Sequence, residues 1–348
     1  MTVGRAPGER ASTATVLRRI GLGGITGSPA ALWVSLVLLV LLLAVPAVLP
    51  GYQTLFRSIL ISVALTYGWN LIGGYTGYVS FGNVAFYGLG TYCAALSQSW
   101  LDAHGIGDRN LQLVLGVALA CVLNAAFAAL VGLPVLRLKG HYFGIATLGL
   151  ALAITDIVGN LDAFGGTGGL AVKQVDDAHF AVYYYAAWIV AAGALAATFF
   201  IARSKLGYAF VAIRENEDAA AVLGISATRY KIIAWALSAA IAGAAGAVFA
   251  PANGFVDPSI AFAEDANVFP IVMCILGGIG TVAGPFIGAL ILSGVNEILQ
   301  RFFIKIHSLF FGAMIVLVVL LLPRGLVWLF GLRGGARTWL KSLSVYKA

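Results

Sequence analysis

Residues 203–231 read RSKLGYAFVAIRENEDAAAVLGISATRYK. This is the one long polar stretch of the chain, and it lies between two segments that are apolar enough to be membrane spans. Its basic residues are Arg203, Lys205, Arg214, Arg229 and Lys231. Because charged side chains are costly inside a bilayer, we expect the stretch to lie in water at one membrane surface.

A short helix is predicted within this stretch, over Glu215–Leu223. Its first turn holds the acids Glu215, Glu217 and Asp218, where the helix dipole favours negative charge. Gly224 follows at the position where a left-handed glycine commonly ends a helix. One face at i, i+3, i+4 spacing is formed by Ala219, Val222 and Leu223. Such a helix would dock an apolar knob into a groove of another protein; the alternative is a solvated loop with one helical turn.

The composition predicts an all-α polytopic membrane protein. Of the 348 residues, 61% are hydrophobic and 10% are charged, which lies outside the range of soluble domains. A helix needs ~20 residues to cross the bilayer. The apolar runs predict about ten crossings, some of them short or broken: 31–48, 54–72, 73–96, 114–136, 142–158, 182–202, 232–250, 268–299 counted as two, and 308–322.

The placement of Lys and Arg predicts the orientation in the membrane. Ten crossings put both termini on the same side as residues 203–231. That side holds sixteen of the 21 Lys and Arg residues, and the other side holds Arg57, Arg109, Lys173, Arg301 and Lys305. Because basic residues concentrate in cytoplasmic segments, we expect basic cytoplasmic tails at 1–30 and 329–348, a transmembrane domain at 31–328 and a cytoplasmic region at 203–231.

Two apolar segments contain enough glycine to break a helix. Gly73–Leu96 reads GGYTGYVSFGNVAFYGLGTYCAAL and predicts an irregular opening around Tyr75–Asn83 before a short helix. Residues 275–292 read ILGGIGTVAGPFIGALIL and predict a break at Gly280–Pro285. Paired broken segments point to a substrate site between them, although glycines also serve as a packing face. The expected path residues are Tyr75, Tyr78, Ser80, Asn83, Gly277, Gly278 and Gly280.

Enzymatic, metal and nucleic-acid functions find no support in the sequence. The four His residues are dispersed, the three Cys residues have no CxxC spacing, and no G-x4-GK-[ST] phosphate loop occurs. No catalytic residue, metal or cofactor is therefore expected, and the basic excess is a topology signal. The deep polar residues are neutral, which disfavours an ion-coupled secondary transporter, because such carriers usually need buried ionisable groups.

The two glycine-rich segments, the polar stretch GYAFVAIRENEDAAAVLGISATRYK and the sequence LPRGL at 322–326 resemble the permease subunit of bacterial branched-chain amino acid ABC importers. The resemblance extends from Gly73 to about Leu326. It implies a non-enzymatic, pore-forming subunit of the inner membrane. It also implies a sister permease in a heterodimer, two cytoplasmic ATPase subunits and a periplasmic solute-binding protein as partners. Similar permeases for urea or short amides remain an alternative.

The resemblance also implies roles within the polar stretch. Asp218–Ala219–Ala220-x3-Gly224 is similar to the EAA-x3-G motif of ABC importer permeases, whose helix seats in a cleft of the ATPase. Asp218 stands where that motif usually has Glu. The implied coupling residues are Arg214, Glu215, Glu217, Asp218, Ala219, Ala220 and Gly224.

Overall fold

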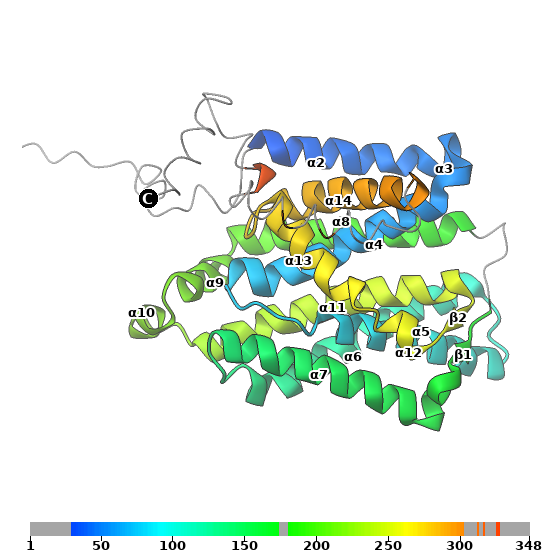
Figure 1. Cartoon of the computed structure of the whole chain (residues 1–348), viewed down its shortest axis with the longest axis horizontal. Coiled ribbons are helices and arrows are strands. Elements are labelled where there is room, and N and C mark those ends of the chain that lie inside the picture. Colours follow the sequence, from blue (N-terminus) through cyan, green and yellow to red (C-terminus); the bar gives the residue numbers. More distant parts are fainter. Residues whose placement is uncertain (1–28, 174–179, 303–311, 313–315, 317–324, 328–348) are drawn as a thin grey trace, which may run out of the picture.

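A computed structural model of the chain describes residues 29–173, 180–302, 312, 316 and 325–327. Most of its long helices run side by side along the molecule (Figure 1). These helices are α2 (Pro29–Leu41), α4 (Gln53–Trp69), α5 (Asn83–Ala103), α6 (Arg109–Val135), α7 (His141–Asn160), α8 (Phe180–Arg203), α11 (Ala227–Asn253), α13 (Asp265–Gly277) and α14 (Gly284–Phe302). The shorter elements are α3 (Val45–Val48), α9 (Lys205–Glu215), α10 (Glu217–Val222), α12 (Pro258–Ala261), β1 (Leu170–Ala171), β2 (Phe255–Val256), and 3-10 turns at Leu42–Ala44, Pro50–Tyr52, Asp162–Phe164 and Gly166–Gly168.

Many helices of the bundle have the length and apolar composition of membrane spans. Within the described residues, seven helical segments are long and apolar enough to cross a bilayer. Two further helices, α5 with 21 residues and α14 with 19, are long but less apolar. The total of ten crossings stays a prediction, and its last span, 308–322, lies largely outside the described residues.

The centre of the bundle is formed by α4 and α11. The share of buried residues is 78% in the span containing α4 and 61% in α11, against 22% in α6. Glycine permits close packing here, because a Cβ on Gly90 of α5 would lie 2.2 Å from the carbonyl oxygen of Gly243 in α11. Small-residue contacts of this kind are the usual means of helix association in membranes.

Two breaks interrupt the bundle where glycine is dense, as the sequence predicts. The first break begins after α4 with a π-helix at Asn70–Tyr75 and continues as the irregular segment 76–82. The second break, residues 278–283, separates α13 from α14. The helix after the first break runs to Ala103, beyond its predicted end at Leu96, because polar residues near a helix end do not stop it.

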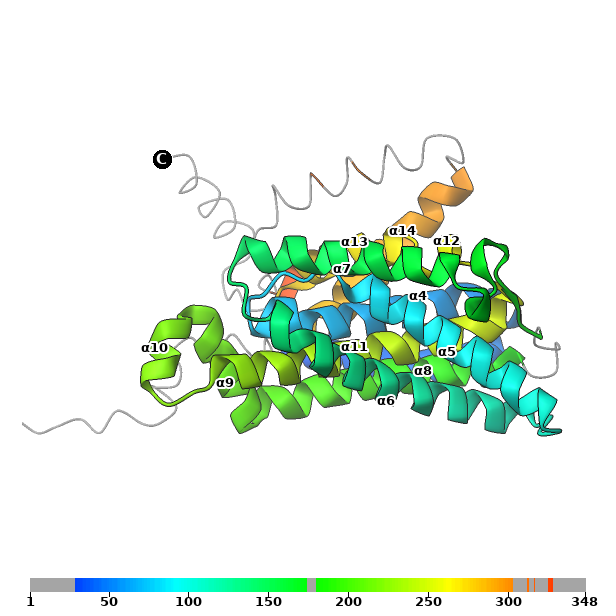
Figure 2. The same ribbon diagram turned by 90° about the horizontal axis from the view of Figure 1, so that it is seen from below.

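The two ends of the bundle carry different structures. α9 and α10 project at one end, which we call the α10 end (Figures 1 and 2). At the opposite end β1 pairs with β2 in an antiparallel ladder, with Leu170 opposite Val256 and Ala171 opposite Phe255. Much of the polar stretch 203–231 therefore forms α9 and α10 at one end of the bundle.

Candidate coupling and transport site

The helix predicted in the polar stretch is present but begins later than expected. α9 ends at Glu215, and α10 covers Glu217–Val222 rather than Glu215–Leu223. Asn216 separates the two helices because its backbone is extended, with φ at −163°. Its side chain accepts a hydrogen bond of 2.9 Å from the backbone N–H of Ala219. This is the side-chain cap that starts a helix, so Glu215 closes α9 instead of opening α10.

α10 presents an apolar tip to its surroundings. Val222 and Leu223 are 89% and 79% exposed, and Ala219 is exposed beside them. Gly224 follows with φ at +83°, a left-handed conformation that favours glycine. Ala220, in contrast, is buried in the hydrophobic core. The predicted apolar face is thus exposed, whereas Ala220 anchors the helix to the bundle.

Three side chains from distant parts of the sequence meet beneath α10. Nζ of Lys231, near the start of α11, lies 3.0 Å from Oε1 of Glu217 and donates to the Tyr78 hydroxyl 3.1 Å away. The Tyr78 hydroxyl in turn donates to Oε2 of Glu217. Nζ also lies 4.4 Å from the centre of the Tyr78 ring. Because the Lys231 side chain is only 2% exposed, we call Tyr78, Glu217 and Lys231 the buried ion cluster.

The electrostatics of the cluster keep Glu217 ionised at neutral pH. Burial alone would raise the pKa of Glu217. Hydrogen bonds from Tyr78 and Lys231, together with the positive charges of Lys231 and Lys139, nevertheless hold that pKa below its ordinary value. An ammonium group buried without an acid would be strongly unfavourable. Lys231 and Glu217 therefore form an ion pair and depend on one another.

Two further ionic contacts surround the cluster. Nη1 of Arg214 donates to the carbonyl oxygen of Gly74 at 3.1 Å, and the same guanidinium pairs with Glu215 at 2.9 Å. Lys139, in the turn between α6 and α7, lies 3.1 Å from Asp218, and both of these side chains are largely exposed. Arg214 therefore reaches the first break, while Glu215 and Asp218 form pairs at the surface.

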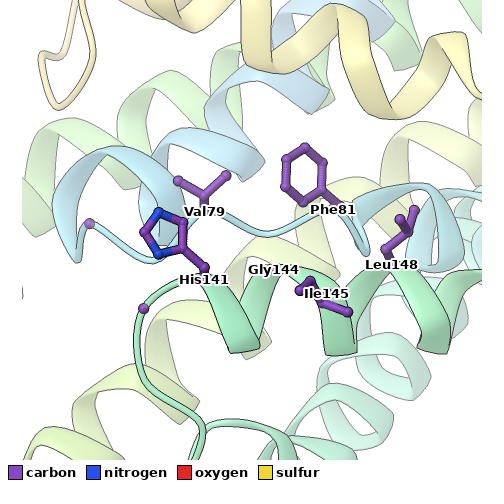
Figure 3. Close-up of a pocket in the computed structure, with 8 residues that line it drawn as sticks. Val79, Phe81, His141, Gly144, Ile145 and Leu148 are labelled. Atoms are coloured by element: carbon purple, nitrogen blue, oxygen red, sulfur yellow. The ribbon is translucent and has the colours of Figure 1, made fainter.

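Burial alternates along segment 76–82. The residues that face into the bundle are Thr76, Tyr78, Ser80 and Gly82. Exposed or half-buried residues alternate with them, namely Gly77, Val79 and Phe81. These three line a groove of about 590 Å³ whose opposite wall is the first half of α7. Figure 3 shows Val79 and Phe81 drawn with His141, Ile145 and Leu148 of α7 around this groove.

Phe81 and Val79 of the groove wall differ in the hydrogen bonds of their backbone groups. The backbone N–H of Phe81 donates to Thr147 Oγ1 at 3.0 Å, and its carbonyl oxygen accepts from Asn267 at 2.8 Å. Among the described residues, by contrast, the N–H and C=O of Val79 have no hydrogen-bond partner. Irregular backbone at membrane depth occurs only where protein or water surrounds it. This side of the groove therefore does not face lipid alone.

Asn70 joins the two breaks directly. Its Nδ2 donates to the carbonyl oxygen of Thr281 at 3.0 Å, and its Oδ1 accepts from the N–H of Gly280 at 2.8 Å. The thiol of Cys274 donates to the same oxygen at 3.2 Å. A Cβ on Gly74 would lie 2.7 Å from the nitrogen of Gly280, so only glycine fits at this crossing. The two glycine-rich segments are therefore in contact, about 200 residues apart in sequence.

The expected path residues divide between these two regions. Those of the first segment are all buried inside the bundle, namely Tyr75, Tyr78, Ser80 and Asn83. Those of the second segment lie at the second break, namely Gly277, Gly278 and Gly280. Among the described residues the hydroxyl of Tyr75 and Oδ1 of Asn83 have no hydrogen-bond partner. Two of the expected path residues thus have a buried polar atom that no described residue pairs.

Lys231 lies in a different environment from the one that the sequence predicts. It belongs to the polar stretch that is expected to lie in water, but its side chain is buried. A helical signal was available, because Lys231, Ala234, Trp235 and Ser238 follow one another at i, i+3, i+4 and i+7 spacing. All four are buried on the inner face of α11. The α11 periodicity thus begins inside the polar stretch.

Comparison with known proteins identifies the family. The family described as "Branched-chain amino acid transport system / permease component" matches residues 52–319. The chain belongs to this permease family. This permease is 33% identical over 324 residues to LivM of Escherichia coli K12, a permease protein of the high-affinity branched-chain amino acid transport system. The match covers 83% of this permease and 73% of LivM.

Other relatives of this permease have the same type of name. LivM of Salmonella typhimurium is 32% identical over 299 residues, or 77% of this permease and 68% of the relative. LivH of the same organism is 27% identical over 276 residues, which cover 75% of this permease and 89% of LivH. No solved structure matches the permease. Together with the seven apolar helices, the family shows that the permease is a multi-pass membrane protein of a transport system.

Proposed function

We propose that this permease is the pore-forming subunit of an ATP-binding-cassette importer that carries branched-chain amino acids across the bacterial inner membrane. The family match over residues 52–319 is the observation that carries the proposal. The permease has no catalytic activity of its own and binds no cofactor. It pairs with a sister permease as a heterodimer, receives substrate from a periplasmic solute-binding protein and is driven by two cytoplasmic ATPase subunits.

The α10 end faces the cytoplasm in this proposal, and ten crossings leave both termini there. Basic residues concentrate on the cytoplasmic side, and those at the α10 end include Arg137, Lys139, Arg203, Lys205, Arg214 and Arg229. The transmembrane domain is then 31–328, with cytoplasmic tails at 1–30 and 329–348 and the cytoplasmic region 203–231. In a cysteine-free background, Ser226→Cys should be labelled from the cytoplasm and Gly107→Cys from outside. Labelling of both from one face would refute this topology.

α10 is the helix that seats in the ATPase. Val222 and Leu223 expose most of their surface at the polar end of the bundle. Apolar side chains presented by a short helix fit the helix-in-groove mode of recognition. Burying one such side chain contributes roughly 1.5–3 kcal/mol. The surrounding coupling residues are Arg214, Glu215, Glu217, Asp218, Ala219, Ala220 and Gly224.

Charge placed on the α10 tip tests this docking. Leu223→Arg puts a charge into the apolar contact and should abolish co-purification of the ATPase subunits and transport in proteoliposomes. Thr228→Arg is the matched control, because Thr228 is also exposed but lies outside α10. Both variants should insert normally, since Leu223 precedes α11 and Thr228 is exposed in the first turn of that helix. Normal ATPase recovery and transport in Leu223→Arg would refute the docking.

The substrate path follows the groove between segment 76–82 and α7. Phe81, Ile145 and Leu148 offer an apolar wall for a branched aliphatic side chain. The N–H and C=O of Val79, which no described residue pairs, offer partners for a carboxylate and an ammonium group. A mostly apolar site with a few polar groups is typical of small-molecule binding. Behind this wall the path is supported by Tyr75, Tyr78, Ser80, Asn83, Gly277, Gly278 and Gly280.

Thiol labelling distinguishes the two faces of segment 76–82. In a cysteine-free importer, Val79→Cys should react with a water-soluble thiol reagent, and leucine in the transport cycle should slow that reaction. Ser80→Cys is the neighbouring control and should not react, because Ser80 is completely buried. Failure of Val79→Cys to react, or an unchanged rate with substrate, would place the path elsewhere.

A further inference from the structure

We propose that Lys231 is a positioning residue that makes α10 and segment 76–82 move together, so that movement of the ATPase reaches the groove wall through Glu217 and Tyr78. The inference rests on the proposed function, because it assumes that α10 seats in the ATPase. It adds the specific contacts that transmit the movement. Those contacts are the hydrogen bonds and the ion pair of the buried ion cluster.

α10 has few other attachments to the bundle. Ala220 is its one buried side chain, and the helix has only six residues. Its outer ion pair with Lys139 involves largely exposed side chains, and exposed pairs contribute little. The contact of Glu217 with Lys231 and Tyr78 is therefore the main polar link between α10 and the membrane-embedded helices.

Separation of this link is strongly resisted. Moving Glu217 away would leave the ammonium of Lys231 buried without an acid, and breaking a buried pair in this way is far more costly than the pair is worth when formed. Lys231 itself is fixed near the start of the central helix α11. A displacement of α10 is thus passed on to Tyr78 more easily than it breaks the cluster.

Tyr78 connects the cluster to the groove. It lies between Gly77 and Val79, whose surfaces line the groove, while its own side chain faces inward. A shift of the Tyr78 side chain therefore moves the wall residue next to it. A second contact runs in parallel, from Nη1 of Arg214 in α9 to the carbonyl oxygen of Gly74. The first break is thus tied to both cytoplasmic helices.

The test compares single and double variants in the complete importer in proteoliposomes. Lys231→Met leaves Glu217 without its cation, and Glu217→Gln leaves Lys231 without its anion. The double variant removes both charges and with them the cost of an unpaired ion. Three quantities are measured on each sample: folded yield, ATPase subunits recovered, and leucine transported per ATP hydrolysed.

The double variant is expected to fold and to bind the ATPase like the wild type, because Glu217 faces Lys231 and is 19% exposed, whereas the docking tip is formed by Val222 and Leu223. Its transport per ATP should nevertheless fall roughly 5- to 150-fold, the range of typical coupling between sites. Tyr78→Phe, which keeps the ring and removes the hydroxyl, should show a smaller loss of the same kind. Lys139→Ala is the control and should leave all three quantities unchanged.

Each other outcome decides against the inference. Wild-type transport per ATP in the double variant would show that the cluster only stabilises the fold. Loss of ATPase recovery in the double variant would show that the cluster shapes the docking surface instead of transmitting movement, and would leave the proposed function standing. Absence of ATPase binding by the wild-type permease would remove the proposed function and the inference with it.

Discussion

The two breaks are both rich in glycine but have opposite surroundings. Segment 76–82 of the first break has one buried face and one face open to a groove. The second break is buried apart from Ile279, which is 45% exposed, and Thr281, which is half-buried. A Cβ on Gly277 would lie 1.8 Å from the carbonyl oxygen of Gly284. A Cβ on Gly77 would instead meet the flexible Arg214 side chain at 2.8 Å.

This difference shows that glycine density predicts irregular backbone but not its role. In the second break, glycine allows two helix ends to approach within contact of their backbones. In the first break, it lets the chain pass from α4 to α5 with the backbone groups of Val79 on the groove side unpaired by any described residue. We therefore call the second break, residues 278–283, the rigid break. We call segment 76–82 the adjustable wall of the groove.

The largest expected effect is in the rigid break. Gly277→Val would force a side chain into the backbone of Gly284, and overpacking of this kind costs about 3 kcal/mol. We expect little folded protein in the membrane, measured by size-exclusion chromatography of the detergent extract. Gly294→Ala in α14 is the control, because its added Cβ would have no atom of the described residues within 4 Å, apart from the neighbouring backbone of α14. A normal yield of Gly277→Val would mean that the second break is not closely packed.

A somewhat smaller effect is expected where the two breaks are joined. Asn70→Leu leaves the buried N–H of Gly280 without the Asn70 side chain, at a cost of about 1–3 kcal/mol. The carbonyl of Thr281 also loses this partner, but it is only partly buried. Asn124→Leu is the matched control, because within the described part of the chain buried Asn124 donates only to a carbonyl of its own helix. Thermal unfolding in detergent should separate the two. Equal stability of these variants would show that Asn70 does not hold the breaks together.

The sequence predicts both breaks because glycine acts locally. Helix weakening by Gly depends on the residue itself and on nothing distant, so the interruptions near Tyr75–Asn83 and Gly280–Pro285 could be inferred. The apolar face of α10 could be inferred for the same reason. Which residues of segment 76–82 face the groove could not, because burial there is decided by α7 and α11, whose positions no local pattern contains.

The same limit explains the errors in the polar stretch. Three consecutive polar residues, Glu215, Asn216 and Glu217, are compatible with one continuous helix start, and only the extended backbone at Asn216 divides them into two helices. Lys231 has the composition of a surface residue but lies on the inward face of α11. Its burial depends on Glu217 and Tyr78, which are 14 and 153 residues away in sequence.

Acid should loosen the adjustable wall without affecting the rigid break. The pKa of Glu217 is held below its ordinary value of 4.5. The stability that ionised Glu217 contributes is therefore fully present above that value and is lost as the pH falls through the folded-state pKa. We expect the stability difference between wild type and Glu217→Gln to be constant above pH 4.5 and to shrink as the pH falls below that value. A difference that persists in acid would show that the charge of Glu217 is not what holds Lys231.

The smallest effect is expected from the exposed ion pair on the same helix. Glu217 and Asp218 are adjacent in α10, and each lies close to a lysine, at 3.0 Å and 3.1 Å. Distance alone would rank the two pairs as equals. Burial separates them, because the Lys231 side chain is 2% exposed and that of Lys139 is 63% exposed. Water and salt screen the outer pair and restore its solvation when it opens, so exposed pairs contribute little.

Lys139→Ala should therefore leave thermal unfolding, ATPase recovery and transport per ATP unchanged within measurement error. The informative comparison is with Lys231→Met under identical conditions, since both variants remove one lysine next to one acid of α10. Raising the salt concentration should also leave these three quantities unchanged in the wild type, because salt screens the buried pair poorly. If Lys139→Ala uncoupled transport as strongly as Lys231→Met, α10 would be held by its charges in general. Burial of Lys231 beside the adjustable wall would then have no special part in transmission.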